Sequence, residues 1–259
     1  NAYCKLGGGL SSLARWLSSN LMECYSPAST HEGYVQLQLS INDQDYSHGD
    51  ALFEYQHMAH VQHILPNKGG VEGGSMLVVS GSHFSERSAS LSYLLCRFNM
   101  TMVSAVNVSS MQLHCITPDH VAGMVTVEVS LNKQQFSTDG VQYEYVEVSL
   151  YGVSPVSGPV KGGTLLMLSG SGLYGSESTG LYCMFGEWAV VAASYEGSGL
   201  VRCTSPDVST STSGGMLAVQ LMSDDVLHMS SVAFFYDAHV SVSSIQPVSG
   251  MVSGGTLLM

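Results

Sequence analysis

The stretch PVSGPVKGGTLLMLSGS, residues 155–171, decides how this chain folds, because it is written nearly three times. Residues 66–82 read PNKGGVEGGSMLVVSGS, and residues 247–259 read PVSGMVSGGTLLM. In each copy a proline is followed seven residues later by Gly-Gly-Ser/Thr and then by an apolar run. A recurrence at a period of about 90 residues indicates a tandem array of like units, which must be recognised before any residue is interpreted alone.

The other landmarks of the repeat recur in the same order. Each unit has two cysteines 19 or 20 residues apart, a Ser/Thr-Pro step after the second cysteine, and a closing pair of aromatic residues. These landmarks are Cys4, Cys24, Ser26-Pro27, Phe53 and Tyr55; Cys96, Cys115, Thr117-Pro118, Tyr143 and Tyr145; and Cys183, Cys203, Ser205-Pro206, Phe234 and Tyr236. The period therefore predicts two complete units flanked by two partial ones.

The even, repeat-locked cysteines predict one disulfide in each unit. Only one pairing treats every unit alike, and it joins Cys4 to Cys24, Cys96 to Cys115 and Cys183 to Cys203. Buried free thiols or metal ligands are the alternatives, although no Cys-x-x-Cys motif or Cys/His cluster supports a metal site. Disulfides in turn indicate an oxidising compartment.

The charge balance excludes several classes of partner. The 259 residues include 8 Lys and Arg against 20 Asp and Glu, which gives a net charge of −12. Nucleic-acid binding and attachment to an anionic membrane surface both need a basic face, so neither is expected. The hydrophobic fraction of 45% is sufficient for buried cores. No apolar run approaches the length that spans a bilayer, so no membrane insertion is expected within this chain.

Alternating apolar and polar residues predict half-buried antiparallel strands. The apolar positions are Val35, Leu37, Leu39 and Ile41 in the first unit, Val125, Val127, Val129 and Leu131 in the second, and Leu217, Val219 and Leu221 in the third. Turns rich in Gly, Ser and Asn separate these segments. Short strands at close spacing with turns between them predict an all-β sandwich.

Taken together, the landmarks resemble the IPT/TIG domain, an immunoglobulin-like sandwich shared by plexins, transcription factors and other proteins. The resemblance is nearest to the disulfide-bearing extracellular type of plexin-like and fibrocystin-like surface proteins. It implies tandem immunoglobulin-like β-sandwiches with one disulfide per domain. It divides the chain into the C-terminal part of one domain (1–57), two complete domains (58–147 and 148–238) and the start of another (239–259). Since the first and last units are partial, we expect the chain to be a fragment.

The connections between units are short. Only 9 or 10 residues separate the last tyrosine of one unit from the proline that opens the next, and none of these connections is rich in Gly/Ser or Pro. Flexible linkers have such compositions. We therefore expect successive domains to abut as a semi-rigid rod.

Two groups of side chains could be taken for metal ligands. One is His57, His60 and His63; the other is Asp43, Asp45 and Asp50. In an extended connector His57 and His60 point to opposite faces, and His57 lies about 20 Å from His63 at the rise of a strand. The aspartates follow Asn42, where Asn and Asp suit a hairpin turn. No Gly or closing Glu completes a calcium loop. We expect no bound metal and no cofactor.

Two sequons are candidate glycosylation sites, Asn99-Met100-Thr101 and Asn107-Val108-Ser109. Asn99 occupies the place taken by Gly7 and Gly186 in the sister units. A glycine there indicates a turn with positive φ, which Asn tolerates. An exposed turn is a suitable place for a glycan.

No nucleophile, base and acid stand together in a motif such as Gly-x-Ser-x-Gly, so we expect no enzyme activity. The leading interpretation is a non-catalytic extracellular segment that acts as spacer and as protein- or glycan-binding scaffold of a cell-surface receptor or adhesion protein. The alternative is the accessory region of a secreted carbohydrate-active enzyme, in which Trp16 or Trp188 would supply an aromatic platform. The DNA-contacting domain of a Rel-type factor is contradicted by the acidic charge and the paired cysteines.

Overall fold

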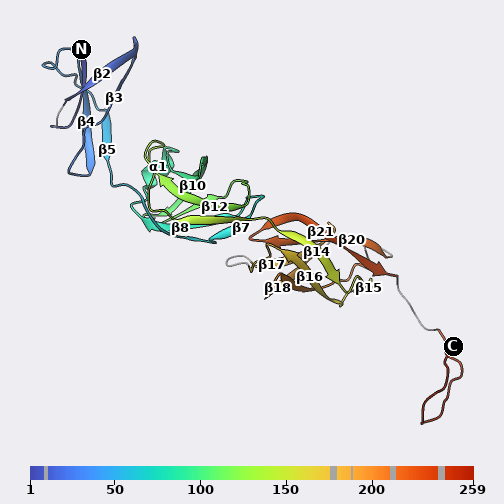
Figure 1. The fold of residues 1–259 in the computed structure, drawn as a ribbon. Helices are drawn as coiled ribbons and strands as arrows, with labels where there is room; N and C mark the ends of the chain where they lie inside the picture. Colours follow the sequence, from blue (N-terminus) through green and yellow to red (C-terminus); the bar gives the residue numbers. More distant parts are fainter. Residues whose placement is uncertain (9–10, 176–179, 188, 211–213, 239–242) are drawn as a thin grey trace.

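The computed structural model describes residues 1–8, 11–175, 180–187, 189–210, 214–238 and 243–259. Over this part the chain is built almost entirely of β-strands, so the predicted all-β class is confirmed. Figure 1 shows three sheet-containing units that follow one another in chain order, with the two termini at opposite ends of an elongated arrangement. The helical exception is α1 (Glu86–Ser90), a short turn capped by the Ser85 side chain.

Each unit is one hydrogen-bonded sheet. The first has five strands in the order β3-β2-β1-β4-β5, with bounds β1 (Ala2–Leu6), β2 (Ser11–Ser18), β3 (Leu21–Cys24), β4 (Gly33–Ser40) and β5 (Leu52–Tyr55). The second has eight in the order β6-β8-β11-β10-β9-β12-β13-β7, with bounds β6 (His60–Leu65), β7 (Lys68–Gly70), β8 (Met76–Ser82), β9 (Leu95–Phe98), β10 (Thr101–Ser109), β11 (Gln112–Ile116), β12 (Gly123–Ser130) and β13 (Gln142–Val146).

The third unit repeats the eight-stranded order as β14-β16-β19-β18-β17-β20-β21-β15. Its strands are β14 (Ser149–Ser154), β15 (Ser157–Pro159), β16 (Leu165–Ser171), β17 (Leu181–Phe185), β18 (Ala189–Gly197), β19 (Leu200–Thr204), β20 (Gly215–Ser223) and β21 (Val226–Asp237). The identical order shows that the sequence repeat is also a structural repeat.

The repeated Pro-x6-Gly-Gly-Ser/Thr stretch connects the two edges of each eight-stranded sheet. In the second unit β6 lies antiparallel to β8, and after the cis Leu65-Pro66 bond β7 lies parallel to β13. The chain then returns through Gly73, whose φ is 66°, and an added Cβ there would lie 2.5 Å from the Pro118 carbonyl oxygen. Glycine is needed at this point because both the backbone conformation and the close approach exclude a side chain.

The core of each complete unit lies between the folded halves of its sheet. The alternating residues Val125, Val127 and Val129 are all buried, as predicted. A tyrosine at the end of the sheet adds a long-range tie, because the Tyr145 hydroxyl donates to the Pro118 carbonyl oxygen at 2.8 Å. Tyr55 and Tyr236 make the same bond to Pro27 and Pro206.

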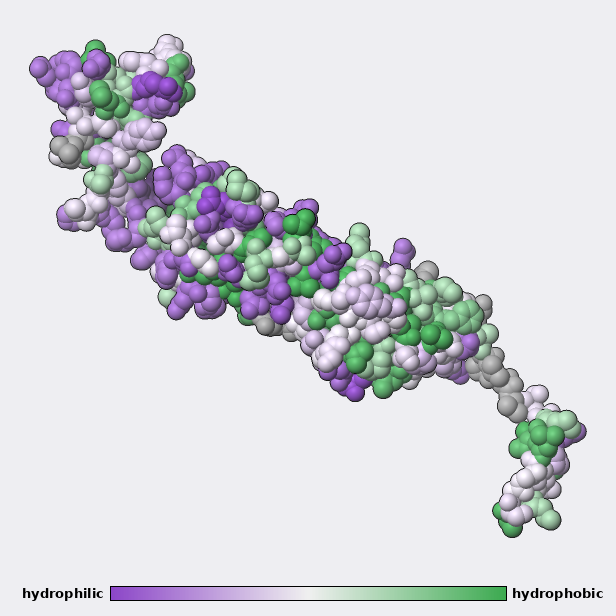
Figure 2. Space-filling view, viewed as in Figure 1, coloured by the Kyte–Doolittle hydropathy of each residue, from purple (hydrophilic) through white to green (hydrophobic). Residues whose placement is uncertain are grey.

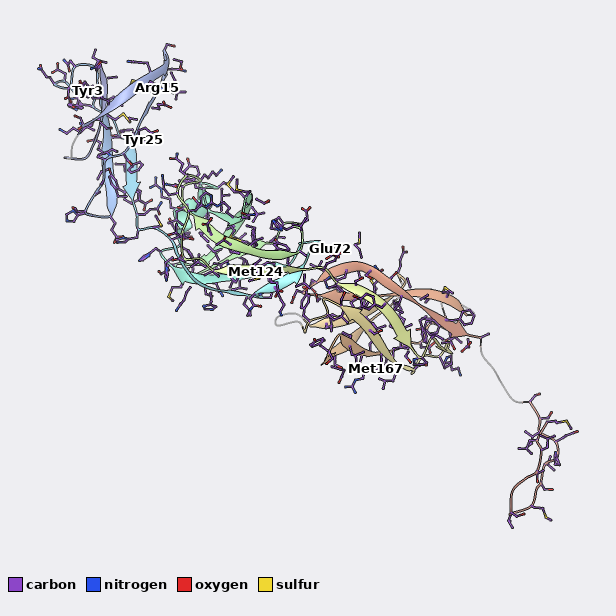
Figure 3. The ribbon with its side chains drawn as sticks, viewed as in Figure 1. Tyr3, Arg15, Tyr25, Glu72, Met124 and Met167 are labelled. Carbon is purple, nitrogen blue, oxygen red and sulfur yellow. A yellow bond between two sulfur atoms is a disulfide. The ribbon has the colours of Figure 1, made fainter. Side chains whose placement is uncertain are left out.

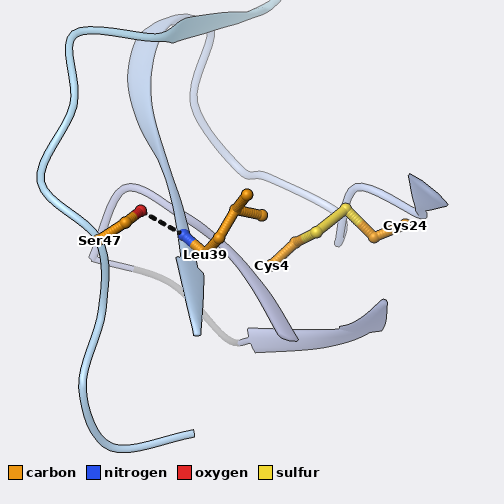
Figure 4. The surroundings of a disulfide bond; sticks show 4 residues. All are labelled: Cys4, Cys24, Leu39 and Ser47. Carbon is orange, nitrogen blue, oxygen red and sulfur yellow. Dashed lines mark hydrogen bonds between the residues drawn. A yellow bond between two sulfur atoms is a disulfide. The ribbon is translucent and has the colours of Figure 1, made fainter. Parts of the chain in front are cut away.

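The structure joins the cysteines in the pairs expected from the repeat: Cys4–Cys24, Cys96–Cys115 and Cys183–Cys203. Each bridge joins a central strand to the strand two places away in the same sheet order. Figure 4 shows the first of them, with Cys4 beside Leu39 of β4 and the Leu39 amide donating to the Ser47 hydroxyl.

One expected core position is wrong. The alternation places Ile41 on the apolar face of its strand, but β4 ends at Ser40 and Ile41 is 73% exposed. Its counterpart Leu131 is 6% exposed and belongs to the second core, where β12 contacts β6. The five described strands of the first sheet include no counterpart of β6, so nothing among them covers Ile41.

The last residues of the chain pair with each other as the opening strands of each complete unit do. The backbone groups of Gln246 and Met259 exchange two hydrogen bonds, of 2.9 and 2.8 Å. The peptide bond that follows Gln246, Gln246-Pro247, is cis. The same spacing pairs Leu65 with Val78 and Ser154 with Met167. Residues 243–259 therefore share the register of the opening hairpin in each complete unit.

Candidate functional site at the junction between the repeats

The two complete units meet with almost no connecting chain. Strand β13 ends at Val146 and β14 begins at Ser149, and the intervening Val148 is buried in the third unit's core. Val146 packs against that same core. The end of one sandwich is thereby anchored in the hydrophobic interior of the next.

Glu72 crosses this junction. It lies in the turn after β7, and Figure 3 shows it between the second and third units. Its carboxylate contacts the third unit at two points. Oε1 accepts a hydrogen bond of 3.2 Å from the Met229 amide, and Oε2 lies 3.3 Å from Nδ1 of His228. The His228 side chain is almost completely buried, while that of Glu72 keeps about one-fifth of its surface exposed.

Behind His228 the contact continues into the third unit. Its Nε2 lies 2.7 Å from the Ser223 hydroxyl, which also hydrogen-bonds to the Tyr174 hydroxyl at 3.1 Å. Burial lowers the pKa of His228, against the attraction of the Glu72 carboxylate, so the imidazole is held neutral at neutral pH. Burial also raises the pKa of Tyr174 to about 12. Burial therefore disfavours a charge on His228 and on Tyr174, and the buried Asp224 lies close to both.

The order Ser223, His228, Glu72 has the form of a nucleophile, base and orienting acid. A hydrolase, however, needs a serine that a substrate can reach. Ser223 is 1% exposed and its hydroxyl is already bonded to Tyr174. The arrangement suits a buried polar joint between two domains rather than catalysis.

The junction was not found from the sequence, because Glu72 and His228 are 156 positions apart. One local signal existed. Gly70 has Pro159 and Met251 at the matching places in the later units. An added Cβ at Gly70 would lie 2.8 Å from Cε1 of His228, so this glycine makes room for the imidazole of the next unit.

The first and second units meet through exposed polar groups. Arg87 of α1 binds Glu54 of β5 at 2.9 Å and lies over the Tyr34 ring. The His57 ring of the first unit lies near the His83 ring of the second, with their centroids 5.1 Å apart. Exposed ion pairs of this kind contribute little to stability. This junction is therefore held more weakly than the one at Glu72.

The histidine triplet does not converge. His57 lies 3.4 Å from Glu32 and its ring is tilted by 42° against that of His83, whereas His60 binds the Asp139 carboxylate at 2.5 Å. Among the residues that the structure describes, no three His, Cys, Asp or Glu side chains gather as a metal site requires.

The predicted turn at Asn42 is confirmed. The Asn42 side-chain oxygen accepts hydrogen bonds from the amides of Gln44 and Asp45, and Asp43 has a φ of 63°. Asn132 makes the same two bonds in the second unit. A hydrogen bond from Tyr46 lowers the pKa of Asp43, and Asp50 lies exposed further along the loop.

The left-handed turn predicted at Asn99 is also confirmed. Its φ is 54°, against 64° and 56° at Gly7 and Gly186, and its amide donates to Thr126 as those glycines do to their neighbouring strands. Asn99 is exposed between β9 and β10. Asn107 lies within β10, where its side chain is outside the described part of the structure. Glycosylation at both positions stays a prediction.

Of the two tryptophans, Trp16 is exposed on β2, and Trp188 lies outside the described residues. Figure 2 shows hydrophobic and hydrophilic residues intermixed over the visible face of the sandwiches. Within the described chain no helix has the length and hydropathy of a membrane span.

Comparison with known proteins agrees with this architecture. The model of the IPT/TIG domain matches residues 59–145 and 149–236. Fibrocystin-L of Mus musculus is 22% identical over 245 residues, covering 94% of this chain and 6% of that protein. Plexin-A3 of Rattus norvegicus is 26% identical over 204 residues, covering 76% of this chain and 11% of that protein.

A solved structure of the full extracellular region of plexin A4, domains 1 to 10, is similar with a TM-score of 0.56 at 14% identity. The alignment covers 95% of this chain and 27% of that one. This chain thus spans a small part of the relatives it matches. The family match, the repeated strand order and the disulfides agree. The chain belongs to the IPT/TIG domain family, with two tandem copies at its centre.

Proposed function

We propose that this chain is a non-catalytic extracellular repeat segment that acts as spacer and as protein- or glycan-binding scaffold of a cell-surface receptor or adhesion protein. Its domains would run from 58 to 147 and from 148 to 238, flanked by the end of one domain at 1–57 and the start of another at 239–259. The similarity to fibrocystin-L and to plexin extracellular regions supports this proposal.

The observation that carries the proposal is the direct joint between the two complete units. A spacer must transmit position from one end to the other, which requires neighbouring domains to keep a fixed angle. Here Val148 is buried across the junction and Glu72 binds Met229 and His228 of the next unit. A buried charge-assisted contact of this type is worth more than an exposed one. The joint therefore favours a rod over a flexible chain.

The chemistry of the described side chains also supports a non-catalytic segment. Ser223 and His228 are closed to solvent, and the Ser223 hydroxyl already bonds to Tyr174. Every cysteine in the chain is paired in a disulfide, so no thiolate nucleophile is available.

Residual dipolar couplings measured on the full chain test the rod directly. If the joint is rigid, backbone amides of strands β6–β13 and β14–β21 fit one common alignment tensor. Glu72→Ala should weaken this agreement, while Glu147→Ala, which removes an exposed carboxylate from the same linker, should not. Two tensors of different magnitude in the unmodified chain would refute the rigid spacer.

The extracellular location is tested separately in protein secreted from eukaryotic cells. Non-reducing peptide mapping should find the Cys96–Cys115 and Cys183–Cys203 cross-links, and enzymatic release of N-glycans in ¹⁸O-labelled water should leave an ¹⁸O-labelled aspartate at position 99. Free thiols at both pairs would exclude an oxidising compartment.

A further inference from the structure

The His228 imidazole is enclosed by both complete units, not by its own unit alone. Within the third unit Nε2 lies 2.7 Å from the Ser223 hydroxyl, and the ring meets that of Tyr174 edge-on, with the centroids 6.1 Å apart. The other edge of the ring faces the second unit. There Nδ1 lies 3.3 Å from Glu72 Oε2, and an added Cβ at Gly70 would lie 2.8 Å from Cε1 and 2.9 Å from Nδ1. The His228 side chain is 2% exposed, so water reaches this edge only when the two units move apart.

The partners of the ring suit its neutral form. An ionised carboxylate has no hydrogen to donate, so the Nδ1 that faces Glu72 carries the hydrogen of the neutral imidazole. Nε2 is then the acceptor, and the Ser223 hydroxyl donates to it. A proton added at Nε2 would place two hydrogens on this one contact. The protonated ring therefore requires the hydroxyl groups behind it to rearrange, whereas the neutral ring does not.

Two carboxylates and one phenol surround the imidazole. Glu72 approaches from the turn after β7, Asp224 from the turn between β20 and β21, and Tyr174 from the segment after β16. Burial disfavours the charged ring and outweighs the attraction of both carboxylates, so the pKa of His228 lies below its ordinary value. Part of this burial is supplied by Gly70 and Glu72 of the second unit. It is therefore relieved when the units separate.

We propose that the joint between the two complete units is a hinge that is closed at neutral pH and opens when His228 takes up a proton from water. A charged imidazole is more stable in water than in the sealed joint, so proton uptake favours separation of the ring from Gly70 and Glu72. The connection through Val148, which is buried in the third core, remains as the pivot. The inference rests on the proposed rigid spacer, because a joint that is loose at neutral pH has no closed state to release.

The direction and size of the effect follow from proton linkage. The open joint binds the proton more readily than the closed joint, so closure is favoured above the ordinary pKa of histidine, about 6.5, and loses this advantage as the pH falls below it. If the proton binds only to the open form, the opening equilibrium rises about 30-fold between about pH 7.5 and pH 5.0. Histidine protonation at about pH 5–6 is a known way of switching an interface. The spacer would then be rigid at neutral pH and jointed in an acidified compartment.

Hydrogen exchange at the Met229 amide follows the joint on the full chain, because this amide is bonded to Glu72 across it. Each rate is divided into the intrinsic exchange rate at the same pH, which gives a protection factor. The factor at Met229 should fall several-fold, and at most about 30-fold, from about pH 7.5 to pH 5.0. The Gly186 amide is bonded to Ala218 within the third unit. Its protection should not change, which separates opening of the joint from loosening of the unit.

Two variants identify the titrating group. His228→Gln should abolish the pH dependence at Met229, because glutamine does not titrate. His63→Gln is the matched control, since it removes an exposed imidazole from the second unit and should leave the dependence unchanged. A fall in Met229 protection that is equally large in His228→Gln would assign it to another group and overturn the proposal.

NMR titration of the imidazole Cε1 hydrogens in the unmodified chain needs no folded variant. His228 should titrate below the ordinary value of about 6.5. Titration at or above that value, or Met229 protection that does not depend on pH, would also overturn the acid-released hinge. The rigid spacer is judged separately. Two alignment tensors at neutral pH refute the spacer, whereas one tensor together with pH-independent protection refutes only the release by acid.

Discussion

Replacing Glu72 by alanine should loosen the third unit without unfolding the second, although Glu72 belongs to the second. The side chain lies in a turn after β7 and contributes nothing to the second hydrophobic core. Its two partners, the Met229 amide and His228 Nδ1, belong to the opposite unit. The effect of the mutation should therefore be found across the junction.

The magnitude follows from the bond to the Met229 amide. A hydrogen bond to a charged group contributes about 1.5–3 kcal/mol, and 1.4 kcal/mol corresponds to about tenfold in an equilibrium. Met229 lies where the pairing between β20 and β21 is irregular, between the Gln220–Ser231 and Met222–Leu227 pairs. If opening of this bond limits exchange, the Met229 amide should exchange about 10- to 100-fold faster in Glu72→Ala.

Hydrogen exchange resolved by mass spectrometry or NMR measures this on the full chain. Glu72→Gln retains one acceptor oxygen and removes the charge, so its effect should be intermediate. The Asn99 amide, bonded to Thr126 within the second unit, serves as an internal reference and should not change. Unchanged exchange at Met229, or equal acceleration at Asn99, would refute the assignment of Glu72 as an interdomain contact.

Three further results are expected. Burial lowers the pKa of His228 below its ordinary value, so the unfolded chain binds the proton more readily than the folded chain. The urea midpoint should therefore fall as the pH decreases from about 6.5 toward the folded pKa. The control is His228→Gln, whose midpoint should stay flat over this range. Tyr145→Phe removes the bond to the Pro118 carbonyl and should cost about 1 kcal/mol of unfolding free energy, measured by urea denaturation; no loss would show that the bond is unimportant. Asn99→Gly should be nearly neutral, whereas Asn99→Val should cost about 1–2 kcal/mol because φ is positive there; equal midpoints for the two variants would contradict the left-handed turn.

Most of the fold could be predicted because its signals are local and repeated. The alternation at Val125, Val127 and Val129 indicates that a single strand has one buried face. Asn99 occupies a position that is glycine in the sister units, and this indicates a positive φ at that residue. Both depend on a few neighbouring residues, and agreement between units removes the ambiguity of a single example.

The failure at Ile41 has a different cause. Its alternation is as regular as that of Leu131, but burial depends on whether another strand covers the position. In the second unit β6 approaches β12 at this end of the sheet. A pattern within one strand specifies which residues share a face, and it cannot specify what packs on that face.

By itself, therefore, the sequence determined the repeat, the all-β class, the cysteine pairs and the turns at Asn42 and Asn99, because each rests on short-range periodicity or on symmetry between units. Only the tertiary structure decided that Glu72 meets His228 and that Gly70 makes room for it. The contact joins two sheets that each fold around a separate core. Its existence depends on the angle at which the sheets abut, and that angle is set by Val148 and its neighbours packing into the next core.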